Sequence, residues 1–203
     1  PKLGSTTATN ERATLEVEIT FNGTKIIKDA AIIGPGDILG ISDKVYVKKE
    51  PDNLVFNYEA NNLAYIEFYE EDFPWRYTPT NVSDGKLTPW LALLMLRDDE
   101  FTLTQGDPHG LPAKIEIKVP ISDVLHPSDE HWAWAHVHVN NPSGTTGGAL
   151  MTHLKNTLPS NPELAVSRLL CSRKLEPNTA YTAFVVPAFE TGRLAGLGET
   201  ALS

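Results

Sequence analysis

The sequence predicts a mainly-β fold of the α+β class, a β-sandwich or barrel-like domain with a small C-terminal α/β part. Three observations support this prediction: an alternating segment that ends in Asn22-Gly23, an apolar run at 90–96, and a change of character after residue 140. The first two are typical of half-buried and fully buried strands. The overall order, many strands followed by two helices and one strand, indicates an α+β domain or a decorated sandwich.

The first predicted element is a β-hairpin. Leu15, Val17, Ile19 and Phe21 alternate with polar residues, which is the period of a strand with one buried face. Asn22-Gly23 follows at once, and both residue types tolerate the positive φ of a type I′ turn. This is the strongest hairpin signal in the chain.

Further strands are predicted at 45–47, 63–69, 115–119 and 179–186. The run 90–96, WLALLML, is apolar on both faces, as in a buried central strand, and it is too short to cross a bilayer. Before it, residues 73–79 combine prolines with dense aromatic side chains. We expect this segment to be a rigid corner ordered by packing.

Two helices are predicted after the glycine-rich connection at 141–148, the first at 149–158. The second begins with Pro162 at its first position, Ser160 or Asn161 as N-cap and Glu163 in the first turn. We expect it to bury leucines up to residue 170, together with Cys171. A short helix with glycine breaks is predicted from Phe189 onward.

The predicted domain organisation is a flexible arm at 1–12 and a single β-rich domain at 13–203, in which 141–203 form the helix-and-strand decoration. The chain has 203 residues, of which 41% are hydrophobic, enough for a sizeable core. Its start, PKLGSTTATNER, lacks the apolar segment of a signal peptide. The missing initial Met indicates either processing or a piece of a longer protein.

Charge and cysteine content narrow the classes of partner. The formal net charge is −9, which argues against binding to nucleic acid or to anionic membrane surfaces. No stretch is long and apolar enough for a transmembrane helix. Cys171 is the single cysteine, so no internal disulfide is possible, as is usual in a reducing cytosol.

The segment 131–139, HWAWAHVHV, is the best candidate for chemistry and is predicted to be one strand. Its even positions share one face: Trp132, Trp134, His136 and His138. Two histidines two residues apart on a strand can both bind a metal. A third ligand would come from Glu130, His109 or Asp107. The simpler interpretation, which we favour, is that this face packs against a second layer or a partner, with no metal.

Other motifs favour structural interpretations. The acidic clusters at 70–72 and 98–100 fit solvated turns, since a glycosidase pair needs a defined separation across a cleft. The segment 142–148, PSGTTGG, lacks the Gly-Lys-Ser/Thr ending of a P-loop. Cys171 lies among leucines without an evident His partner, so we expect a buried thiol and not a nucleophile. No catalytic residue is predicted.

Several segments form a combination that extends from about Gly34 over most of the chain. They are GPGDILG at 34–40, IEF at 66–68, DFPW at 72–75, YTP at 77–79, LTPWL at 87–91, WAWAHV at 132–137, RLLCSR at 168–173, YTAFVVP at 181–187 and the segment 189–198. Together they resemble an uncharacterised bacterial family associated with gene clusters for phage-tail-like contractile injection systems. Members of that family are longer, which is compatible with this chain being the N-terminal domain of a larger protein.

The resemblance implies a non-enzymatic structural or adaptor component of such a particle, as a baseplate, cap or accessory protein without a cofactor. Expected partners are other protein subunits and further copies of the chain, assembled in the cytoplasm and released within an extracellular particle. Candidate partner-binding residues are Trp75, Arg76, Tyr77, Trp132 and Trp134, because Trp and Arg are favoured interface anchors.

Two other functions stay open at this point. One is a metal-dependent hydrolase that uses His136 and His138. The other is a carbohydrate-binding module in which Trp75, Trp132 or Trp134 is exposed as a stacking platform.

Overall fold

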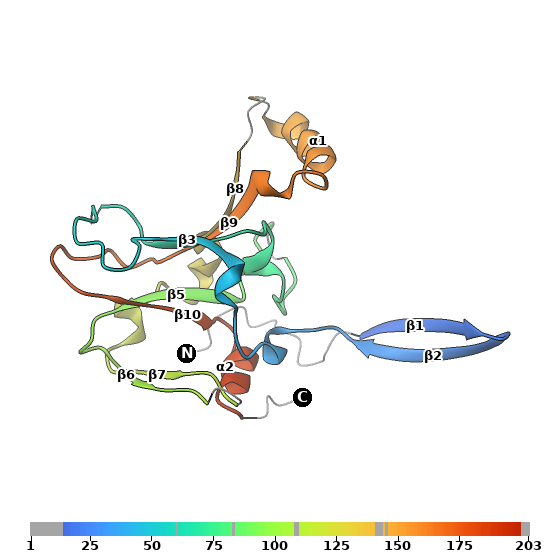
Figure 1. Ribbon diagram of the computed structural model, residues 1–203, viewed down its shortest axis with the longest axis horizontal. Coiled ribbons are helices and arrows are strands. Elements are labelled where there is room, and N and C mark those ends of the chain that lie inside the picture. The colour runs from blue at the N-terminus through green and yellow to red at the C-terminus, as the bar shows by residue number, and fades with distance from the viewer. Residues whose placement is uncertain are drawn as a thin grey trace.

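A computed structural model describes residues 14–59, 61–82, 84–107, 110–140, 144 and 146–199. Within these residues the fold is mostly β, with several small sheets, two α-helices and no closed barrel (Figure 1). This confirms the predicted mainly-β fold with a smaller helical part. The sandwich arrangement stays a prediction, and the predicted arm at 1–12 lies outside the described residues.

The largest sheet has four antiparallel strands in the spatial order β3-β4-β9-β8. They are β3 (Tyr46–Glu50), β4 (Tyr65–Phe68), β9 (Ala165–Leu170) and β8 (Ala135–Val139). Buried and half-buried residues alternate along β9, so that Ala165, Ser167 and Leu169 face the core. The opposite face of the sheet is outward and largely polar.

The core is built around β5 (Leu91–Leu96), which pairs with β10 (Thr182–Pro187) in a separate two-stranded antiparallel sheet. Every residue of β5 is buried, and the strand contacts β9 of the larger sheet. This confirms the predicted buried strand. Because β10 is its only paired neighbour among the described strands, β5 is buried by side chains packed on both faces and not by a central position in a wide sheet.

A hairpin of β6 (Phe101–Thr104) and β7 (Lys114–Ile117) and the helix α2 (Glu190–Gly196) complete the body. The rings of Phe101 and Phe184 meet edge to face at 4.9 Å and join this hairpin to β10. In α2, a Cβ added to Gly192 would lie 2.9 Å from Cβ of Pro187. Glycine therefore allows the helix to lie this close to the strand.

Short 3₁₀ helices connect the strands within the described part of the chain. They are Pro35–Asp37, Asp43–Val45, Phe73–Trp75, Ile121–Asp123, Ser128–Trp134 and Pro162–Leu164.

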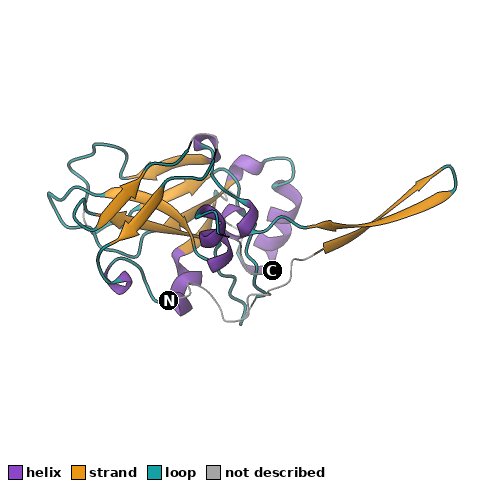
Figure 2. Ribbon diagram, turned by 90° about the horizontal axis from the view of Figure 1, so that it is seen from below, coloured by secondary structure: helices purple, strands orange, loops and turns teal. Residues whose placement is uncertain are grey.

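The N-terminal hairpin projects away from the body in both views (Figures 1 and 2). It consists of β1 (Thr14–Phe21) and β2 (Thr24–Ala31), paired in register from Thr14 opposite Ala31 to Phe21 opposite Thr24. Asn22 and Gly23 have φ values of 47° and 77°, as both central residues of a type I′ turn require. The predicted hairpin is confirmed.

The predicted second helix is wrong. Residues 162–164 form a 3₁₀ helix that begins with Pro162, as expected, but the chain then continues as β9. The strand lies between β4 and β8, so its backbone groups have partners on both sides. Pairing on both edges outweighs the weak helical pattern of the leucines, because tertiary context routinely overrides local propensity.

The prediction that 131–139 is one strand is also wrong in its first half. Residues Ser128–Trp134 form a 3₁₀ helix, and β8 begins only at Ala135. The helical turn buries His131 completely and stacks Trp134 on His126, and a straight strand would not direct both side chains inward. Trp132 and Trp134 therefore do not share a strand face with His136 and His138.

The helix α1 (Gly147–Thr157) confirms the predicted first helix, beginning two residues earlier than expected. None of its described residues is fully buried. Together with the ends of β8 and β9 it forms a second projection from the body (Figure 1).

Candidate functional site

The β1–β2 hairpin presents a row of exposed apolar side chains along its length. Cross-strand partners in an antiparallel pair share a face, so Leu15 with Ala30, Ile19 with Ile26, and Phe21 with Thr24 lie on the same side. Leu15, Ile19 and Phe21 are 61%, 58% and 69% exposed. This face of the hairpin is therefore mainly apolar and largely exposed, and Thr24 and Lys28 are its polar residues.

The opposite face of the hairpin carries most of its charges. Glu16 lies opposite Asp29, and Lys25 forms an ion pair with Glu18 at 2.8 Å. Both partners are well exposed, so the ion pair contributes little to stability. The hairpin is thus amphipathic in the way of a strand pair that lies on another surface, but no described element of the body covers its apolar face.

The apolar surface continues at the root of the hairpin. Ile32 and Ile33 follow β2 directly and are 52% and 57% exposed, and Leu39 lies in the connection to the body. An isolated two-stranded hairpin is at best marginally stable in water. Within the described residues, the hairpin has little buried apolar surface to stabilise it.

The sequence prediction missed this site, although it found the hairpin itself. Period-two alternation indicates that one face of a strand is buried, and it gives no information on whether the covering surface belongs to the same chain.

The predicted partner-binding residues at 75–77 lie in a packed corner. The indole Nε1 of Trp75 donates a hydrogen bond of 3.0 Å to the Leu87 carbonyl, and Tyr77 packs edge to face on Trp90 at 5.0 Å. Of the three, only Arg76 is exposed. It pairs with Glu70 and with Asp72. Trp75 and Tyr77 therefore order the corner, and their role in partner binding stays a prediction.

The other two predicted anchors differ in exposure. Trp132 is 40% exposed, and Nζ of Lys86 lies 4.2 Å from its ring centroid. Trp134 is half-buried and stacks on His126, with ring centroids 5.3 Å apart. Of these two residues, Trp132 alone presents an exposed aromatic surface, and Lys86 lies over part of it.

His136 and His138 share one face of β8, as predicted, and this face is exposed within the described residues. His136 is opposite Arg168, and burial, followed by the Arg168 charge, lowers its pKa. Within the described residues no three His, Cys, Asp or Glu side chains form a group able to hold a metal. Glu130 and Asp107 are not brought to the two histidines in such a group, and His109 lies outside the described residues.

Two other histidines form a buried pair that the sequence prediction did not single out. Nε2 of His126 and Nδ1 of His131 are 2.6 Å apart, and the two rings stack with centroids 4.8 Å apart. Burial lowers the pKa of each to about 4. Both rings are therefore neutral at pH 7, and one ring donates its N–H to the other.

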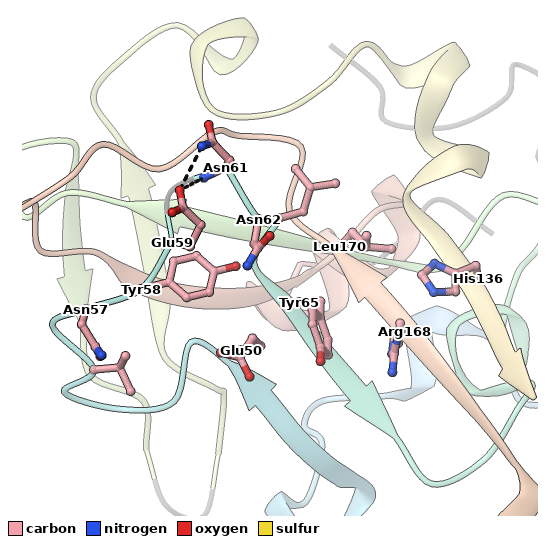
Figure 3. Close-up of a pocket in the computed structure, with 12 residues that line it drawn as sticks. Glu50, Asn57, Tyr58, Glu59, Asn61, Asn62, Tyr65, His136, Arg168 and Leu170 are labelled. Atoms are coloured by element: carbon pink, nitrogen blue, oxygen red, sulfur yellow. Dashed lines mark hydrogen bonds between the residues drawn. The ribbon is translucent and has the colours of Figure 1, made fainter. Parts of the chain in front are cut away.

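A polar cleft lies on the outward face of the four-stranded sheet, beside the loop at 51–63 (Figure 3). Its volume is about 710 Å³. Strands β3, β4 and β8 contribute one lining residue each and β9 contributes two, and the loop supplies the remainder. The lining residues are Glu50, Val55, Asn57, Tyr58, Glu59, Asn61, Asn62, Leu63, Tyr65, His136, Arg168 and Leu170.

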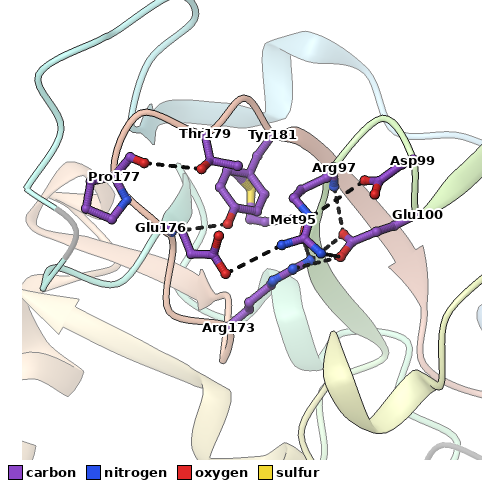
Figure 4. A network of polar contacts seen from close by, with 9 residues as sticks. All are labelled: Met95, Arg97, Asp99, Glu100, Arg173, Glu176, Pro177, Thr179 and Tyr181. Carbon is purple, nitrogen blue, oxygen red and sulfur yellow. Dashed lines mark hydrogen bonds and ion pairs between the residues drawn. The ribbon is translucent and has the colours of Figure 1, made fainter.

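The predicted acidic turn at 98–100 contains a structural ion pair (Figure 4). Glu100 is 3% exposed, so the expectation of a solvated cluster is wrong for this residue. Its carboxylate accepts hydrogen bonds from Arg173 at 2.5 and 2.8 Å and pairs with Arg97 at 2.8 Å. The same Arg173 donates to the Met95 carbonyl of β5. This network ties the central strand to the segment after β9.

Cys171 follows β9 and is fully buried, which confirms the predicted buried thiol, although in a strand context and not in a helix. Burial raises its pKa, so the reactive thiolate is disfavoured.

Comparisons with protein-family models, with curated proteins and with solved structures found no match to this chain. Across the described residues, no helix has both the length and the apolar character needed to cross a membrane.

Proposed function

We propose that this chain is a non-enzymatic structural or adaptor subunit of a multiprotein particle, specifically of a phage-tail-like contractile injection particle. The observation that carries the proposal is the projecting β1–β2 hairpin, whose apolar face is uncovered along its length. The kind of particle rests on the resemblance of the segments from Gly34 onward.

In this proposal the apolar face of the hairpin binds an apolar surface of a neighbouring protein subunit. Eight residues per strand give the hairpin a length of about 27 Å, enough to reach across a neighbour. The charges on the opposite face stay in water, and Lys28 is the one charged side chain that the contact would have to accommodate. An arm of this kind can hold neighbouring subunits in a fixed arrangement without any catalytic group.

The experiment is assembly with and without a charge on the apolar face. The chain is produced together with the other proteins of its gene cluster, and particles are isolated and imaged by electron microscopy. Ile19→Glu places a carboxylate in the contact, and we expect it to abolish incorporation of the chain. Thr20→Glu is the matched control, since Thr20 lies on the opposite face of the same strand.

Incorporation of Ile19→Glu at the level of Thr20→Glu would refute the role of the hairpin. Absence of the unaltered chain from every particle of the cluster would refute the structural role itself. Neither substitution is expected to unfold the chain, because both side chains are exposed. Tryptophan fluorescence, which reports on the buried Trp90, checks this directly.

A further inference from the structure

The cleft beside the 51–63 loop offers mainly neutral hydrogen-bonding groups. Three asparagine amides and two tyrosine hydroxyls line it: Asn57, Asn61, Asn62, Tyr58 and Tyr65. An amide both donates and accepts, and so does a phenol. The side-chain amides of Asn57 and Asn62 make no hydrogen bond with any described residue. These groups point to a ligand that is itself rich in donors and acceptors.

The charged groups of the cleft already have partners of opposite charge or hydrogen-bond partners within the chain. Nε of Arg168 donates to Glu67 at 2.6 Å, and the Arg168 guanidinium lies 4.9 Å from the Tyr65 ring centroid. Glu59 accepts bonds from the backbone and side chain of Asn61 at 3.1 and 2.9 Å. Glu50 and Glu59 also line the cleft, and Glu67 lies against Arg168, so an anionic ligand would meet several carboxylates. The charge pattern therefore favours a neutral ligand.

The cleft also contains an apolar part. Val55, Leu63 and Leu170 contribute aliphatic surface beside the polar groups. A pyranose ring has the matching character, with C–H groups across its faces and hydroxyl groups around its edge. A volume of about 710 Å³ lies within the usual range for small-molecule sites and accommodates one or two sugar units.

Tyr58 supplies an unpaired group at the inner end of the cleft. Its hydroxyl is buried and has no hydrogen-bond partner within the described residues. In Figure 3 it is directed toward the side of the cleft where Asn62 lies. A buried hydroxyl without a partner is costly. A ligand hydroxyl that enters as the loop shifts outward would provide the missing bond.

We propose that this cleft binds a neutral saccharide of one or two sugar units. The proposal goes beyond the structural role proposed above and does not depend on it, because the cleft and the β1–β2 hairpin share no residue.

The test is isothermal titration calorimetry of the full chain. The ligands are glucose, galactose, N-acetylglucosamine, maltose and cellobiose, with inorganic phosphate as the charged comparator. We expect saturable binding of at least one of the five sugars and none of phosphate. Asn62→Ala should weaken that binding about fivefold, the usual effect of one lost hydrogen bond. Asn53→Ala, in the same loop but outside the lining, is the matched control and should leave the affinity unchanged.

Tyr58→Phe gives a second readout that a purely structural role would not produce. Removal of an unpaired buried hydroxyl should raise the melting temperature by about 2 °C or more, while the affinity for the sugar falls. The proposal is overturned if none of the five sugars binds, if Asn62→Ala and Asn53→Ala bind equally well, or if phosphate displaces the sugar.

Discussion

Glu100 illustrates how a single residue can differ from the local pattern that surrounds it. In sequence it belongs to an acidic run, yet its carboxylate is buried between two arginines (Figure 4). The hydrogen bonds from Arg173, more than any other contact, lower the pKa of Glu100 to about 2. Arg173 in turn donates a hydrogen bond to the Met95 carbonyl of β5. The same arginine therefore joins the buried carboxylate to the strand at the centre of the core.

We expect Glu100→Gln to lower the free energy of unfolding by about 2 kcal/mol, because it leaves the buried Arg173 without its counter-charge. Urea denaturation at pH 7 measures the change. Asp99→Asn is the matched control: Asp99 also faces Arg97, at 3.6 Å, but its side chain is 81% exposed. This control should change the free energy by less than about 0.5 kcal/mol. Equal effects of the two substitutions on the free energy of unfolding would show that burial does not strengthen the Glu100–Arg173 ion pair.

The His126–His131 pair gives the protein a defined response to acid. Burial holds the pKa of each ring at about 4, below the ordinary value of 6.5. Between these values the unfolded chain binds more protons than the folded chain, so the free energy of unfolding falls as the pH drops from about 6.5 to 4. At pH 5 the loss is roughly 2 kcal/mol for each ring. The contribution of Glu100 is lost only at lower pH, between about 4.5 and 2.

His126→Phe tests this assignment, because phenylalanine keeps a flat ring in the stack and removes one titrating group. The free energy of unfolding, measured by urea denaturation at pH 7, 6 and 5, should decrease less steeply in the variant than in the parent chain. An unchanged slope would mean that the acid response arises elsewhere.

At the scale of secondary-structure elements, the sequence correctly predicts the elements that a few consecutive residues determine. Asn22-Gly23 between two alternating segments strongly favours one conformation, a type I′ hairpin turn. The structure contains this turn. The apolar run at 91–96 can only be buried, and it is. In both cases the evidence lies within a few consecutive residues, so no knowledge of distant contacts was needed.

The elements that were predicted wrongly depend on distant partners. Residues 165–170 contain apolar residues at both helical and strand spacing, and pairing with β4 and β8 decides for a strand. At 131–134 the burial of His131 against the core decides for a 3₁₀ helix. The polar cleft was also beyond sequence reasoning, because its lining comes from four strands and a loop that the fold alone brings together.

At the scale of the whole molecule, stability is concentrated in the body and absent from the two projections. The core cluster gathers around β5, whereas every described residue of the β1–β2 hairpin except Val17 is exposed, and none of α1 is fully buried. Regions with few buried apolar contacts open locally at low free energy. The molecule therefore consists of a well-packed body and two elements that make few buried contacts with it.

Limited proteolysis with trypsin separates these parts. In the isolated chain, we expect the first cuts at Lys25 and Lys28 of the hairpin, where local opening exposes the backbone. Arg173, which is held in its buried ion pair, should resist cleavage until the body unfolds. Mass spectrometry of the early fragments identifies the sites, and Lys25→Gln with Lys28→Gln should remove them.

If neighbouring subunits cover the hairpin in a particle, the same lysines become protected there. Early cleavage at Arg173, or equal cleavage of the hairpin in the free and assembled states, would contradict this division of the molecule.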